Sequence, residues 1–146
     1  MKTPSSGQVL YVSWGGTGRS ASLRSAFRQA AERGGPLVYL AVLDNSTFGD
    51  VDDDMGLVVA DELEWLLDAQ VNLTRTQLGI EDMPVRVAVR RGEVIDEIAA
   101  AVDTLGEALI LLGAPVPVAG HASLEDLVSA VSNRTGQPTE LALPED

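Results

Sequence analysis

The sequence predicts an α/β fold, namely an open five-stranded parallel sheet in a doubly wound, three-layer α/β/α sandwich. Three observations support this prediction. The 146 residues fit a single domain. Short apolar runs alternate with segments of helical periodicity along the chain, and several of these runs are apolar throughout, as in strands covered on both faces. We therefore expect residues 8–146 to form one domain, preceded by a flexible tail of residues 1–7.

The elements alternate regularly between strand and helix. An apolar run at residues 9–12 leads into a glycine-rich turn, and a helix is expected from Ser20 to Arg33, where Gly34, Gly35 and Pro36 stop it. The later strands are expected at residues 37–43, 84–89, 108–112 and 138–143, and the later helices at residues 55–78, 93–105 and from Ser123 to Gly136. Arg86 and Arg90 alternate with valines in the third strand, which is typical of a strand at the edge of a sheet.

The long helix over residues 55–78 has many apolar residues, so its buried side must be inferred from their spacing. The side chains expected to face the sheet are Val59, Leu63, Leu66, Leu67 and Leu73.

Composition excludes several classes of function. The chain has no cysteine and one histidine, so disulfides, thiol catalysis and clustered Cys or His metal sites are excluded. A formal charge of −12 repels phosphate backbones and anionic lipids, so we expect neither nucleic-acid nor membrane binding. The absence of a long apolar run and of an apolar signal core predicts a soluble, cytoplasmic protein. Residues 1–43 are the exception in charge, with five basic residues and one acidic residue, and would attract a small anion.

Ligands of such sheets bind where the loops leave the carboxyl ends of the central strands. The loop after the first strand contains Gly16-x-Gly18-x-x-Ala21, a loose dinucleotide fingerprint, and Asp44 after the second strand is placed to bind a ribose hydroxyl. Bound NAD is one interpretation, and glycines that only form the turn are the other. The acidic residues 44–54 leave calcium binding or a solvated loop open, although the spacing is not that of an EF-hand, and no metal ligands are assigned.

A glycine after the third strand, Gly92, an isoleucine six positions later, Ile98, and the block Leu105 to Gly113 resemble the universal stress protein family. The resemblance covers residues 8–143 and implies the adenine-nucleotide alpha-hydrolase-like fold. It further implies a bacterial stress-response protein that acts as a regulatory or protective module and not as a turnover enzyme. Family dimers pair through the last strand, so a homodimer is implied through residues 138–143.

The ATP-binding pattern of the family is only partly present. The acid that ends the first strand corresponds to Trp14, and the acid before the fourth strand to Ala108. In the family's phosphate loop, G-x2-G-x9-G-[ST], Gly113 matches the first glycine, Val116 stands at the second with Gly120 nearby, and Ser123 matches the end.

We therefore expect that ATP is not bound in the usual family mode. The alternative is a sensor that binds ATP, AMP or NAD through the glycine-rich loop after the first strand, so the cofactor stays unknown. No catalytic residue is assigned. The resemblance implies that Val42 would meet an adenine through its backbone, while His121 is open to three interpretations: a phosphate contact, an acid–base group or a structural loop residue. The candidate cofactor-binding residues are Ser13, Trp14, Gly15, Gly16, Thr17, Gly18, Val42, Asp44, Gly113, Gly120, His121 and Ser123.

Overall fold

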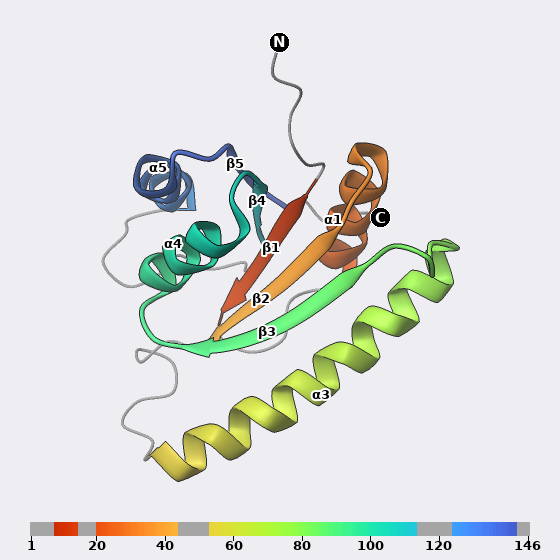
Figure 1. Ribbon diagram of the computed structural model, residues 1–146, viewed down its shortest axis with the longest axis horizontal. Coiled ribbons are helices and arrows are strands. Elements are labelled where there is room, and N and C mark those ends of the chain that lie inside the picture. Colours follow the sequence, from red (N-terminus) through yellow and green to blue (C-terminus); the bar gives the residue numbers. More distant parts are fainter. Residues whose placement is uncertain (1–7, 15–19, 44–52, 114–123, 143–146) are drawn as a thin grey trace.

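The computed structural model describes residues 8–14, 20–43, 53–113 and 124–142, and shows strands alternating with helices (Figure 1). The elements are β1 (Val9–Trp14), α1 (Ser20–Arg33), β2 (Leu37–Leu43), α3 (Asp53–Leu78), β3 (Val85–Arg91), α4 (Val94–Leu105), β4 (Leu109–Leu112), α5 (Leu124–Thr135) and β5 (Thr139–Leu141). The predicted order of elements is confirmed, and α1 has the predicted bounds. The predicted tail, residues 1–7, lies outside the described residues.

The five strands form one sheet in the order β3-β2-β1-β4-β5, and every neighbouring pair is parallel. The chain moves outward from β1 to β3 and then returns to the other side of β1 for β4. The direction of winding therefore changes between β1 and β4, and the helices that follow these two strands, α1 and α5, pack on opposite faces of the sheet. The predicted position of β3 at an edge is also confirmed.

Helices cover both faces of the sheet, as the doubly wound prediction requires (Figure 1). Alternation along β1 sends Leu10 and Val12 into a cluster with α4 and α5, and Val9 and Tyr11 into a second cluster with α1 and α3. Where their burial is described, the residues of strands β1, β2 and β4 have almost no exposed surface, which explains the largely apolar sequence of these strands.

The predicted orientation of α3 was partly wrong. Leu63 and Leu67 pack against the sheet as expected, but Leu66 and Leu73 are exposed, at 52% and 59%. Leucines occur on two sides of this helix, and periodicity alone does not show which side meets the sheet.

Among the described helices, none combines the length and apolar character that a membrane crossing requires.

Candidate functional site

Four of the predicted contact residues meet at the carboxyl edge of the sheet. Ser13 and Trp14 end β1, and Trp14 is in register with Val42 of β2. On the other side of β1, the Gly113 N–H donates to the Val12 carbonyl at 2.7 Å. Three adjacent strands therefore bring Ser13, Trp14, Val42 and Gly113 to the edge where the winding of the sheet reverses, which is the usual ligand position in open α/β sheets.

Gly113 lies against the phenol ring of Tyr11. A Cβ atom placed on Gly113 would overlap the Tyr11 ring and its hydroxyl, so this position accepts no side chain while the tyrosine stays in place. The structure thus gives a packing reason for the glycine that matches the start of the family's phosphate loop, and this reason needs no ligand.

Tyr11 belongs to a buried polar cluster below the carboxyl edge. Its ring meets that of Tyr39 edge to face, with ring centroids 4.9 Å apart and an interplanar angle of 88°. The Ser13 hydroxyl, also fully buried, donates to the Tyr39 hydroxyl oxygen at 3.3 Å. The hydroxyl of Ser13 therefore points into the α1/α3 side of the sheet, where the tyrosines lie.

The hydroxyl of Tyr11 is buried and has no hydrogen-bond partner among the described residues. Burial, and to a lesser extent the neighbouring Tyr39, raises the pKa of Tyr11 above its ordinary value of 10.0. The phenol consequently stays neutral at any physiological pH.

Val42 is buried in β2 and has register partners on both sides, Trp14 in β1 and Arg90 in β3. Its side chain belongs to the aliphatic cluster under α4 and α5. Contact between an adenine and the Val42 backbone stays a prediction.

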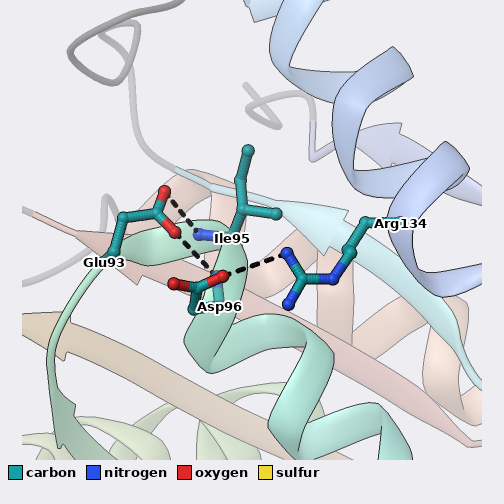
Figure 2. A network of polar contacts seen from close by, with 4 residues as sticks. All are labelled: Glu93, Ile95, Asp96 and Arg134. Carbon is teal, nitrogen blue, oxygen red and sulfur yellow. Dashed lines mark hydrogen bonds and ion pairs between the residues drawn. The ribbon is translucent and has the colours of Figure 1, made fainter.

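The N-terminus of α1 is suited to an anion, whereas that of α4 is already occupied. At α4 the Glu93 carboxylate accepts hydrogen bonds from the backbone N–H groups of Ile95 and Asp96, at 3.3 Å and 3.0 Å (Figure 2). Asp96 in turn pairs with Arg134 of α5 at 3.0 Å. The first turn of α1 contains no acidic residue, so its positive end has no competing carboxylate of its own.

The remaining predicted contact residues lie outside the described residues. They are Gly15, Gly16, Thr17, Gly18, Asp44, Gly120, His121 and Ser123. Most of the acidic loop weighed as a calcium site also lies there, but its last two aspartates, Asp53 and Asp54, begin α3. Within the described part of the chain, no group of three or more His, Asp or Glu side chains is placed to hold a metal ion.

The sequence analysis missed the tyrosine cluster. Tyr11 was interpreted only as part of an apolar strand, and Tyr39 was not singled out. The available signal was that β1 and β2 each carry one tyrosine near the middle of the strand, but only the register Tyr11 to Tyr39 makes the two rings neighbours.

The fold and the position of the site define a class: a parallel, doubly wound α/β protein whose candidate ligand edge lies between β1 and β4. A sequence profile of the Universal stress protein family matches residues 15–134, most of the chain. The chain therefore belongs to the universal stress protein family.

Solved structures with this fold include relatives of the same family. The universal stress protein UspA from Lactobacillus plantarum is 13% identical, with a TM-score of 0.56 over 92% of this chain and 97% of that one. A protein from the universal stress protein family of Burkholderia pseudomallei is 19% identical, with a TM-score of 0.58 over 97% of this chain and 100% of that one. At these identities the likeness supports the fold alone. No curated protein matches the sequence.

Proposed function

We propose that this chain is a regulatory or protective stress-response module that does not bind ATP in the usual family mode. The observation that carries the proposal is the contact between Gly113 and Tyr11, because it explains the glycine without a phosphate. Trp14 stands where the family pattern has an acid, and an indole cannot supply a carboxylate. Gly113 is therefore weak evidence for an ATP site, and the acid that the family pattern has at the end of the first strand is missing.

A second candidate is a sensor of ATP, AMP or NAD that uses the loop between β1 and α1. Two observations favour it. Only residues 15–19 separate the end of β1 from the start of α1, and three of these five are glycines. The first turn of α1 has no acidic side chain, so no carboxylate of that turn would compete with a phosphate for the backbone N–H groups.

Thermal unfolding with ATP and Mg²⁺, ADP, AMP or NAD tests both candidates. A ligand at one hundred times its Kd adds about 2.7 kcal/mol to the free energy of unfolding, which raises the Tm of a chain this size by roughly 5–10 °C. The first candidate expects no rise with any of the four. A rise that Gly18→Val removes and Gly120→Val leaves intact supports the sensor. A rise with ATP that Gly120→Val removes overturns the first candidate, because it shows binding through the loop after β4.

We further propose a homodimer through the outer edge of β5. Within the described residues β5 pairs only with β4. Ile110 N–H donates to Pro138 and Ala142 N–H to Leu112, so the alternation along a strand directs the N–H of Thr139 outward. We expect sedimentation equilibrium to give the mass of two chains, and Thr139→Pro, which removes that outward N–H, to give the mass of one. The mass of a single chain for the unmodified protein would refute the dimer.

A further inference from the structure

The exposed large apolar side chains of the described residues all lie on α3. They are Val58, Trp65, Leu66 and Leu73, and the indole of Trp65 is the most exposed, at 71%. Exposed tryptophan is costly to leave in water, and clustered apolar surface of this kind marks interaction sites. These four side chains form what we call the α3 stripe.

The α3 stripe faces away from the rest of the fold. With 3.6 residues per turn, positions 58, 65, 66 and 73 fall on one side of the helix. The opposite side carries Leu67, Val71 and Thr74, all of which are buried. Figure 1 shows α3 lying along the edge of the sheet beside β3, and among the described residues the sheet and α1 pack against the side that carries Leu67 and Val71. The stripe is therefore a second apolar side, with no role in the core.

Acidic side chains border the stripe. Asp61 and Glu62 line a shallow hollow of about 450 Å³ together with Trp65 and Leu66. Neither carboxylate makes a hydrogen bond or an ion pair with any residue that the structure describes. The helix as a whole has six acidic residues and one arginine. An indole beside two carboxylates can hold a cationic side chain both by ion pairing and through the face of the ring.

This charge decides between the possible occupants. A second copy of α3 would bring two strongly acidic helices together at the 8–10 Å separation of packed helices. An anionic lipid surface would repel the same carboxylates. A basic partner is not repelled by these carboxylates, and its apolar side chains would bury the exposed apolar side chains of the stripe. From Val58 to Leu73 the stripe is about 22 Å long, which matches roughly four turns of a helix laid along it.

We propose that the α3 stripe and its acidic border dock a basic amphipathic helix of a partner protein. The partner's apolar side chains pack on Trp65, Leu66 and Leu73, and its Lys or Arg side chains pair with Asp61 and Glu62. In this mode of recognition the partner helix places apolar side chains at its positions i, i+3, i+4 and i+7 on an apolar surface. The surface is separate from the carboxyl edge of the sheet, so the proposal does not depend on whether a nucleotide binds.

The test uses a fluorescein-labelled 14-residue peptide of leucine and lysine, patterned as an amphipathic helix, and the full chain. Fluorescence anisotropy should show binding that weakens at least tenfold in Trp65→Ala and in Glu62→Lys, and that weakens as NaCl is raised from 50 to 500 mM. Both replaced side chains are exposed, so circular dichroism and the Tm should stay unchanged. A peptide with glutamate in place of lysine should not bind.

Asp103→Lys provides the matched control, because it makes the same change of charge at an exposed position of α4, on the other face of the sheet. It should bind the peptide within twofold of the unmodified protein. The proposal is overturned if the peptide does not bind, or if Asp103→Lys weakens binding as much as Glu62→Lys, which would show general attraction to an acidic protein. It is equally overturned if Trp65→Ala converts a dimer to a monomer in sedimentation equilibrium, or if vesicles with anionic lipid bind through Trp65.

Discussion

Among the described residues, the buried cluster under α4 and α5 consists only of leucine, valine, isoleucine and alanine, whereas the face under α1 and α3 also buries Tyr11, Tyr39 and Ser13. The buried Ser22 and Thr74 are likewise on α1 and α3. An all-aliphatic face needs only matching shapes to be stable. Features that stability does not require, an unpartnered phenol and a helix with a second apolar side, both occur on the α1/α3 face. That face is therefore the better place to look for function.

The largest expected difference lies between two neighbouring leucines of α3. Leu67→Ala should lower the free energy of unfolding by about 2–5 kcal/mol, because Leu67 is fully buried and its removal leaves a cavity. Leu66→Ala, the matched control one residue earlier, should change it by no more than about 0.5 kcal/mol, because Leu66 is exposed. Urea unfolding followed by circular dichroism measures both. Equal losses for the two variants would mean that the α3 stripe is part of the core.

The same pair of residues shows what the sequence could predict and what it could not. The alternation of arginine with valine predicted the edge position of β3, and apolar runs and stop signals were enough for the order of elements and for the bounds of α1. They failed on Leu66 and Leu73, because a 26-residue helix with apolar residues on two sides has no single hydrophobic direction. Which side is buried depends on the docking angle of α3, a tertiary property.

The candidate site was predictable only to the level of the strand ends. Parallel topology placed Ser13, Trp14, Val42 and Gly113 at one edge, as expected from the order of elements. The reason for Gly113 was not predictable, because its neighbour Tyr11 is distant in sequence and on another strand. A glycine that satisfies a binding motif and a glycine that makes room for a tyrosine look the same in a sequence.

The next effect concerns that glycine. Gly113→Ala should destabilise the fold by about 1–3 kcal/mol, since the new methyl group would overlap the Tyr11 ring in a close-packed region. In a Tyr11→Leu background the ring is absent, so the same substitution should cost less than half as much. A double-mutant cycle from urea unfolding measures this coupling. Equal costs in both backgrounds would remove the packing explanation and restore Gly113 as evidence for a phosphate loop.

A smaller effect should appear at alkaline pH. The pKa of Tyr11 is raised in the folded state, so the unfolded chain releases this proton from about pH 10 while the folded protein keeps it. Stability from this group is fully present below pH 10 and declines above it, by up to about 1.4 kcal/mol per pH unit. Urea midpoints at pH 8 and pH 10.5 measure the decline, and Tyr11→Phe should reduce it. At pH 8 that variant should be as stable as the unmodified protein or slightly more so, because the hydroxyl it removes has no partner among the described residues.

The smallest effect is expected on the aliphatic face, at the ion pair that joins α4 to α5. Asp96 and Arg134 are 3.0 Å apart, but both side chains are more than half exposed (Figure 2). Water and salt screen such a pair, so Arg134→Met should cost no more than about 1 kcal/mol, and less in 1 M NaCl. Glu93→Ala is a useful comparison at the same helix end: it removes two hydrogen bonds to backbone N–H groups and should cost about 0.5–2 kcal/mol. If Arg134→Met proved the more damaging of the two, the contact between α4 and α5 would depend on charge, and the view of this face as held by aliphatic packing would be wrong.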